Sequence, residues 1–241
     1  MKSKLITIKN PKSLISEAYR SIRTNLDFLS FDKNIKIVAF TSSEASEGKT
    51  TTVCNMAEVM NQAGKNVLVI DCDLRKPTVH SVYDLKNTNG LTNYLSGGND
   101  LQQIIQLTDT GINIISSGPI PPNPSELLNS NKMKQMLDLV SSTFDVILID
   151  TPPINIVTDA TIMARMVDGV VLIIAANCTR IEKAIHAKSL LEKVDAHLLG
   201  VILNRKKIKK KQYYTDYSYL EENETSRIKK RKPCRRSKKF T

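Results

Sequence analysis

Short apolar runs alternate along the chain with longer segments in which apolar residues recur every three or four positions. The apolar runs occur at residues 35–40, 66–70, 112–115, 146–149, 169–175 and 198–203. A run that is apolar throughout predicts a strand covered on both faces, whereas the longer recurrence predicts an amphipathic helix. This alternation predicts an α/β fold with a mostly parallel central sheet and helices on both faces.

The segments between the apolar runs predict the helices. They span residues 14–29, 53–62, 79–85, 91–95, 123–144, 159–167 and 180–194. Ser13 is a suitable N-cap for the first helix, and Pro124 fits the first turn of the helix over 123–144. We therefore expect an N-terminal helical segment over residues 1–34 and an α/β domain over residues 35–204.

The first predicted helix is amphipathic. Its apolar positions are expected to face the core, and they are Leu14, Ala18, Ile22, Leu26 and Leu29. Glu17, Arg20 and Arg23 lie on its polar face, where (i, i+3) pairing on a solvated surface is the ordinary interpretation.

A polar loop, FTSSEASEGKTTT at residues 40–52, joins the first strand to the second helix. The run Gly48-Lys49-Thr50 in this position is typical of a phosphate loop. Backbone N–H groups and the helix dipole of such a loop bind anionic oxygens, the lysine reaches the terminal phosphates and the threonine ligates Mg²⁺. We expect ATP to contact Ser43, Glu44, Ala45, Ser46, Glu47, Gly48, Lys49, Thr50 and Thr51.

Two further predicted strands end in aspartate. Asp71 and Asp73 follow the strand over 66–70, and Asp150 follows the strand over 146–149. Ligands of open α/β sheets bind at the carboxyl ends of the strands, so these carboxylates are expected beside the phosphate loop. A single aspartate there is often a helix N-cap, but three of them together indicate a Mg²⁺ site, because this ion prefers hard oxygen ligands.

Composition adds limits on the class of protein. The chain has 241 residues, and its four cysteines lie far apart without a CxxC pair, which indicates reduced thiols rather than disulfides or a zinc site. No apolar run is long enough to span a membrane, and residues 1–10 lack the apolar core of a secretory signal. We therefore expect a cytoplasmic protein.

The net charge of +11 belongs to the C-terminal segment. Residues 205–241 hold 15 Lys/Arg and 4 Asp/Glu, so the remainder of the chain is neutral. A basic segment without apolar periodicity predicts a flexible tail with affinity for polyanions.

This tail also contains four of the seven tyrosines, Tyr213, Tyr214, Tyr217 and Tyr219. Tyrosines without a core indicate modification or contact; a stacking patch for nucleic acid is disfavoured because it leaves the ATP site without a role.

The motifs at three strand ends resemble those of the deviant phosphate-loop ATPases related to cell-division and plasmid-partition proteins. Within that group they most resemble the bacterial tyrosine kinases of capsular and exopolysaccharide synthesis, the CpsD/CapB type. VAFTSSEASEGKTTT, VLVIDCDLRKP and VILIDTPP resemble the Walker A, A′ and B motifs of these kinases. SEAYRSIRTNL at residues 16–26 resembles their E-x-x-R-x-x-R oligomerisation helix, and the four tail tyrosines resemble their C-terminal tyrosine cluster.

The resemblance implies that the chain is an ATP-dependent protein tyrosine kinase. The implied catalytic residues are Lys49, Asp71, Asp73 and Arg75, with Asp71 accepting or orienting the tyrosine hydroxyl. The implied Mg²⁺ ligands are Thr50, Asp73 and Asp150. Asn204 and Arg205 would lie near adenine, and Asp159 would be a helix cap or a residue at a subunit interface near the site.

The resemblance also implies partners. Glu17, Arg20 and Arg23 would build a ring-like homo-oligomer, in which the tail of one subunit is phosphorylated by its neighbour. A membrane adaptor of the polysaccharide chain-length regulator type would recruit and activate the kinase at the inner face of the membrane, and a tyrosine phosphatase would reset it. The implied role is the regulation of capsule or exopolysaccharide synthesis and export.

Two departures from the family pattern leave alternatives open. Ala45 and Ser46 replace the usual Pro-Gly of the loop, and a positive φ at Ser46 costs ~1 kcal/mol, so an ATP-binding scaffold without kinase activity is one alternative. A positioning ATPase of the partition type is the other. Glu44 stands where that subgroup has a second lysine, which argues against it.

Overall fold

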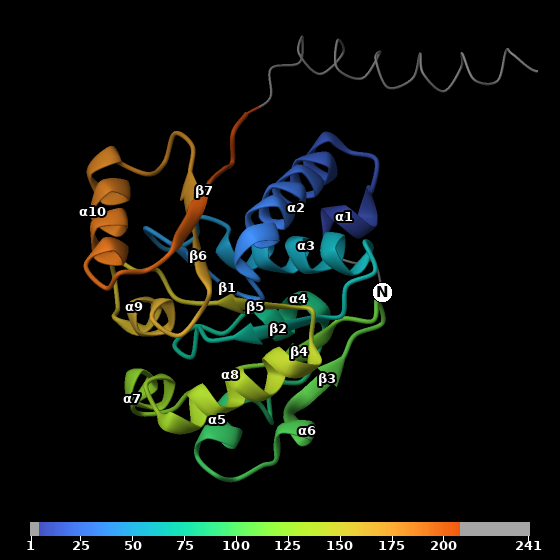
Figure 1. The fold of residues 1–241 in the computed structure, drawn as a ribbon, viewed down its shortest axis with the longest axis vertical. Helices are drawn as coiled ribbons and strands as arrows, with labels where there is room; N and C mark the ends of the chain where they lie inside the picture. The colour runs from blue at the N-terminus through green and yellow to red at the C-terminus, as the bar shows by residue number, and fades with distance from the viewer. Residues whose placement is uncertain (1–4, 208–241) are drawn as a thin grey trace, which may run out of the picture. The chain divides into compact units, whose positions relative to one another are not determined.

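The computed structural model describes residues 5–207, and Figure 1 shows its fold. The four tail tyrosines and most of the basic segment lie outside the described residues. The domain boundaries expected at residues 34 and 204 also stay predictions.

A seven-stranded sheet forms the centre of the described chain. Its strands are β1 (Ile37–Ser42), β2 (Val67–Asp71), β3 (Ile105–Leu107), β4 (Asn113–Ile115), β5 (Val146–Asp150), β6 (Gly169–Ala175) and β7 (Leu198–Asn204). They lie in the order β3-β4-β2-β5-β1-β6-β7, and each neighbouring pair is parallel except β3 with β4. The predicted fold class, a mostly parallel α/β sheet, is therefore confirmed.

Helices cover both faces of the sheet (Figure 1). In chain order they are α1 (Ile6–Lys9), α2 (Leu14–Lys33), α3 (Lys49–Asn61), α4 (Val79–Tyr83), α5 (Leu91–Leu95), α6 (Leu101–Ile104), α7 (Pro124–Leu128), α8 (Asn131–Thr143), α9 (Asp159–Ala164) and α10 (Ile181–Glu192). On one face, Met56 of α3 is buried in the same core as Phe40 of β1. On the other, Met133 of α8 is buried with Leu68 of β2. The central strands are thus covered as their apolar runs predict. The prediction is wrong for the edge strand β7, where Val201 is 53% and Leu203 51% exposed.

Strand register brings the strand-end aspartates together. The three central strands β1, β2 and β5 are buried at every residue. Asp71 of β2 pairs in register with Asp150 of β5, and Asp150 pairs with Phe40 of β1. Both aspartates therefore lie at the carboxyl ends of their strands, on the same side of the sheet from which the phosphate loop leaves β1.

The helix predicted over residues 123–144 is wrong as a single element. It divides into α7 and α8, because Ser130 has an extended backbone and its Oγ accepts a hydrogen bond of 3.2 Å from Met133 N. This is a helix N-cap, which satisfies a backbone donor of a new helix. The apolar periodicity continues across the break, so the pattern alone did not reveal it.

Three short elements, α1, α6 and β3, were not predicted. β3 has three residues and pairs antiparallel with β4 at one edge of the sheet. Runs this short carry too little periodicity to be distinguished from a loop.

The buried face of α2 differs from the prediction. Ser13 caps the helix as expected, with its Oγ accepting from Ser16 N at 3.2 Å. Tyr19 and Leu26 are buried, whereas Ala18 is exposed and Leu29 is 43% exposed. Arg23 turns toward α3, and its Nη1 donates to the carbonyl oxygen of Val59 at 2.9 Å. The helix is therefore rotated relative to the expected apolar face, and part of that face remains on the surface.

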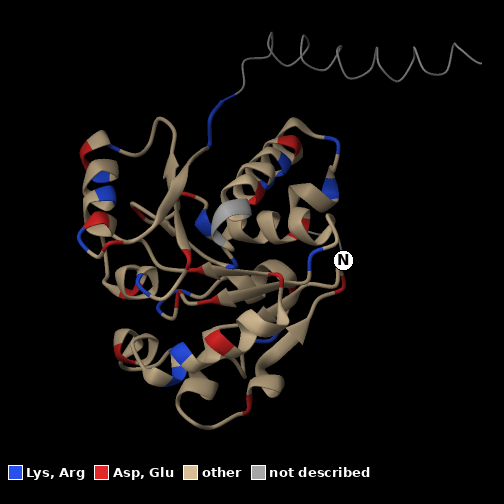
Figure 2. Cartoon of the chain, viewed as in Figure 1, with Lys and Arg blue, Asp and Glu red and all other residues tan. Residues whose placement is uncertain are grey.

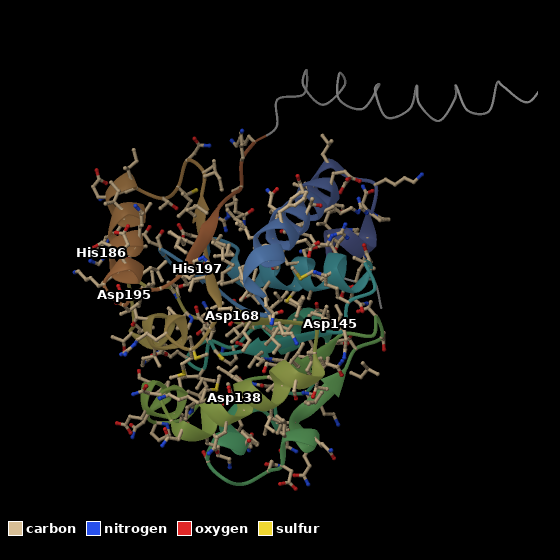
Figure 3. The ribbon with its side chains drawn as sticks, in the orientation of Figure 1. Asp138, Asp145, Asp168, His186, Asp195 and His197 are labelled. Carbon is tan, nitrogen blue, oxygen red and sulfur yellow. The ribbon has the colours of Figure 1, made fainter. Side chains whose placement is uncertain are left out.

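Two other aspartates accept hydrogen bonds at the amino ends of the strands. Asp168 Oδ2 accepts from the backbone N–H groups of Lys36 and Ile37 at 2.8 Å, and Asp145 Oδ2 accepts from Asn66 N at 2.8 Å. Figure 3 labels both aspartates, with His197 near Asp168. These carboxylates satisfy backbone donors where β1 and β2 begin, and so have a structural role.

The charged side chains of the described part are interspersed over the helices (Figure 2). This distribution agrees with the neutral balance of the residues before the tail. Within residues 5–207, no helix combines the length and the apolar content needed to cross a membrane.

Candidate active site

The phosphate loop joins β1 to α3, as the sequence predicts. Gly48 is the N-cap of α3, with a φ of 91°. This backbone conformation favours glycine, and a Cβ here would lie 2.2 Å from Nδ2 of Asn204 and displace that side chain. The loop therefore meets the amino terminus of a 13-residue helix, where backbone N–H groups favour an anion.

Lys49 extends from this loop to the strand-end carboxylates. Its Nζ lies 2.6 Å from Asp150 Oδ1 and 3.6 Å from Asp73 Oδ2. Burial favours the neutral amine, but the charges of Asp150 and Asp73 outweigh burial and raise the pKa of Lys49. Burial raises the pKa of Asp73 in turn, although Lys49 opposes this effect. The ammonium thus balances two buried carboxylates.

Thr50 adds a hydroxyl to the same cluster. Its Oγ1 donates to Asp150 Oδ2 at 2.6 Å and accepts from Thr78 Oγ1 at 3.0 Å. The residues expected to hold Mg²⁺ are Thr50, Asp73 and Asp150, and their hydroxyl and carboxylate oxygens are linked through Lys49 and Asp150. This donor set fits a hard divalent cation. Thr78 was not predicted, because a lone threonine after a strand carries no recognisable signal.

Asp71 is completely buried and faces backbone N–H groups. Its Oδ2 accepts from Thr78 N and Val79 N at 3.1 Å each, and its Oδ1 accepts from Asp73 N at 3.2 Å. Burial, followed by the charge of Asp150, raises the pKa of Asp71 to about 8. Asp71 therefore shapes the loop after β2 through these backbone hydrogen bonds.

Arg75 forms an ion pair with Asp159, in which the guanidinium is partly exposed and the carboxylate is buried. Its Nε lies 2.9 Å from Asp159 Oδ2, and its Nη2 lies 3.1 Å from Asp159 Oδ1. Ser125 Oγ donates to Asp159 Oδ1 at 2.6 Å, and Asp159 is completely buried. The pair joins the loop after β2 to the start of α9 and to α7. Ser125 was not predicted, since only the folded chain brings it to this pair.

The end of β7 holds the other side of the loop. Asn204 Nδ2 donates to the carbonyl oxygen of Glu47 at 2.8 Å, and the Arg205 guanidinium donates to the carbonyl oxygen of Ser46. Ser46 has a φ of 64°. This is the left-handed conformation that was expected to be unfavourable for a residue with a side chain. Asn204 and Arg205 thus contact the loop backbone.

A cleft of about 570 Å³ opens above these residues. Its volume is in the range of small-molecule sites. One part is polar and includes Lys49, Thr50 and Asp73, and another is apolar and includes Pro152 and Ile156. The remaining lining residues are Ser42, Ala45, Ser46, Glu47, Gly48, Thr51, Arg75, Lys76, Thr78, Val82, Pro153, Val157 and Arg205. The cleft can thus take a phosphate group at one end and a flat apolar group elsewhere.

The expected oligomerisation residues lie on α2, outside the residues that line the cleft. Arg20 forms an ion pair with Glu17 and donates from Nη2 to the carbonyl oxygen of Pro11 at 2.7 Å. Arg23 is held by Val59, as described above, and lies 4.0 Å from Asp27. All three residues have partners within this chain.

Comparisons with known proteins agree on one family. A family model described as an AAA domain matches residues 35–197. Tyrosine-protein kinase YwqD of Bacillus subtilis is 45% identical over 220 residues, covering 91% of this chain and 92% of that protein. The putative tyrosine-protein kinase CapB of Staphylococcus aureus is 40% identical over 216 residues, covering 89% of this chain and 95% of that protein.

Solved structures agree with this similarity. The crystal structure of the chimerical protein CapA2B2 superposes with a TM-score of 0.82 at 37% identity, covering 85% of this chain and 90% of that chain. The septum site-determining protein MinD of Pyrococcus horikoshii, solved with Mg-ADP, has a TM-score of 0.61 at 23% identity and 70% coverage of each chain, which shows a shared fold. The chain therefore belongs to the CpsD/CapB type of bacterial tyrosine kinases.

Proposed function

We propose that the cleft binds ATP with Mg²⁺ and transfers the γ-phosphoryl group to tyrosine. The observation that carries this proposal is the convergence of Lys49, Thr50, Asp71, Asp73 and Asp150 at one edge of the sheet. Phosphoryl transfer needs charge neutralisation, in-line positioning and an acceptor for the hydroxyl proton. These residues offer a group for each requirement.

Lys49 neutralises charge on the terminal phosphates. To do so it moves its ammonium from Asp150 and Asp73 to the phosphate oxygens, and Thr50, Asp73 and Asp150 are then free to hold Mg²⁺. The bound ion supplies charge stabilisation and orients the phosphate oxygens. The loop N–H groups at the start of α3 hold the phosphates.

Asp71 receives the tyrosine proton. The phenolic oxygen bonds to the γ-phosphorus as the bond to the bridging oxygen of ADP breaks, and the hydroxyl proton passes to the Asp71 carboxylate. Its raised pKa suits a group that must take a proton and release it again. Arg75 positions the loop that carries Asp73 through its pair with Asp159.

The protein substrate in this proposal is the tail of a neighbouring subunit. Tyr213, Tyr214, Tyr217 and Tyr219 lie together in a polar segment of the chain. Each phosphate adds nearly two negative charges, so several would offset much of the tail's charge of +11 and weaken its docking.

Assembly into a ring through α2 completes the proposal. Glu17 and Arg20 are partly exposed on this helix, which also carries the exposed apolar residues Ile15 and Leu29. A membrane adaptor would hold the ring at the inner face of the membrane and activate it, and a tyrosine phosphatase would reset it. Control of capsule or exopolysaccharide synthesis is the cellular role we propose.

The test is intact-mass and site analysis of the purified chain incubated with ATP and Mg²⁺. Lys49→Met and a variant with Tyr213, Tyr214, Tyr217 and Tyr219 changed to Phe serve as comparisons. The adaptor's cytoplasmic peptide is added in a parallel set of samples, because the kinase can be inactive without its adaptor. We expect phosphotyrosine in the wild type only. ATP binding without phosphate in any sample would instead support a nucleotide switch or a scaffold.

A further inference from the structure

Glu47 is a buried carboxylate in the phosphate loop. The residue is 4% exposed, and no Lys or Arg of the described chain forms an ion pair with it. A buried charge without a cation is costly unless hydrogen-bond donors surround it. The hydrogen-bond donors around the Glu47 carboxylate therefore indicate its role.

Four donors surround the Glu47 carboxylate, and they come from two parts of the chain. Within the loop, Ser43 Oγ donates to both carboxylate oxygens at 2.9 and 3.0 Å, and Glu44 N donates to Oε2 at 2.9 Å. From outside the loop, Thr179 Oγ1 donates to Oε1, and Ala175 N lies 3.4 Å from the same atom. The carboxylate thus joins both ends of the loop to the turn between β6 and α10.

The loop needs this support because its backbone is locally unfavourable. Ser46, next to Glu47, has a φ of 64°, where a side chain is disfavoured, and Ala45 beside it is exposed. A conformation of this kind persists only where surrounding contacts determine it. The bonds from Ser43 to Glu47 are buried and the bond from Thr179 is half-buried, whereas the bond from Arg205 to the loop is exposed.

We propose that Glu47 is a positioning residue that holds the phosphate loop in its nucleotide-receiving conformation by tying Ser43 and Glu44 to Thr179. This inference rests on the proposed function only in taking the loop to be the nucleotide site. Glu47 acts through the loop and leaves the carboxylates of β2 and β5 in place. Its loss therefore weakens nucleotide binding and raises KM for ATP, with little change in kcat at saturating ATP.

The test compares four variants of the full chain by calorimetric ADP affinity with Mg²⁺ and by backbone hydrogen exchange over residues 43–47. Glu47→Gln removes the charge and turns one of the two acceptor oxygens into an NH2 donor, and Thr179→Val removes the hydroxyl donor. Each should raise the Kd for ADP about tenfold, as expected for lost hydrogen bonds to a charged group. Thr179→Ser keeps the hydroxyl and should bind ADP as the wild type does. Glu182→Gln removes an exposed carboxylate from the first turn of α10 and is the matched control.

Loop exchange should accelerate in Glu47→Gln and Thr179→Val alone. An ADP affinity within twofold of the wild type in both variants would overturn the proposal, as would unchanged affinity with a lowered kcat. If Glu47→Gln does not fold, Thr179→Val decides the matter against Thr179→Ser. A wild type that binds ADP but phosphorylates no tyrosine contradicts the kinase proposal and leaves this one standing, whereas a wild type that binds no ADP overturns both.

Discussion

Lys49 is the residue on which the charge balance of the cleft depends. Among the described residues, it is the only Lys or Arg within ion-pair distance of Asp73 or Asp150. Two carboxylates face this one ammonium, so the cluster holds more negative than positive charge. A divalent cation arriving with nucleotide would relieve this imbalance, and this gives two predictions at the scale of single residues.

The first prediction concerns Lys49→Met. The substitution leaves Asp73 and Asp150 buried without their cation, so we expect the free energy of unfolding to fall by about 3 kcal/mol near pH 7 in EDTA. Millimolar Mg²⁺ should restore part of this loss by supplying the missing charge. Urea unfolding with EDTA or Mg²⁺ measures both effects. Lys188→Met removes an exposed ion pair with Glu192 and should change stability by less than about 0.5 kcal/mol; equal losses in the two variants would contradict the argument.

The second prediction concerns Asp71 and pH. Because burial raises the pKa of Asp71 to about 8, the carboxylate form that accepts a proton is the minor form at pH 7 and becomes the major form above pH 8. The rate of tyrosine phosphorylation should therefore rise with pH through this region. Added positive charge from Mg²⁺ should move the midpoint downward.

A pH–rate profile at saturating ATP tests this prediction, with Asp71→Asn as the comparison. The variant should lose roughly 10²-fold or more in rate together with the rising limb. A wild-type profile that is flat between pH 6.5 and 9 would exclude Asp71 as the proton acceptor.

At the scale of elements, local hydrogen bonds decide where helices begin. Ser130 starts α8 within a stretch whose apolar pattern is continuous, and Gly48 starts α3 with a positive φ that favours glycine. In both cases one residue redirects the backbone at the first turn of the helix.

Ser130→Ala removes the N-cap of α8, and we expect the free energy of unfolding to fall by about 1 kcal/mol. Ser142→Ala in the same helix is the matched control, because Ser142 is exposed and its Oγ bonds only to Leu139 O of its own helix. The measurement is the urea midpoint at constant m-value. A loss in the control equal to that in Ser130→Ala would show that the cap contributes nothing.

At the scale of the whole molecule, α2 places an apolar surface on the outside of the described chain. Phe28 is 74% exposed, Ile15 51% and Leu29 43%, on the helix that carries Glu17 and Arg20. Exposed apolar residues gathered on one element indicate a protein interface. The rotation of α2 relative to its expected face thus suits the proposed ring.

Changing Ile15, Phe28 and Leu29 to Ser should therefore lower the oligomer mass without lowering the thermal midpoint. Sedimentation velocity with ADP and Mg²⁺ measures the mass across a concentration series. Ile120→Ser is the control, since Ile120 is 65% exposed in the loop before α7. Identical masses for the wild type, the triple variant and the control would argue against an interface on α2.

The sequence by itself determined the α/β class, the phosphate loop and the three strand-end aspartates. These features are local: periodicity shows a strand, and the residue that follows a parallel strand lies at the ligand-binding edge. The tertiary structure decided which face of α2 is buried, the break at Ser130, and the pairing of Arg75 with Asp159. It also placed Thr179 on Glu47 across 132 residues. Contacts between residues so far apart depend on how helices and loops pack around the sheet, and no local pattern records that packing.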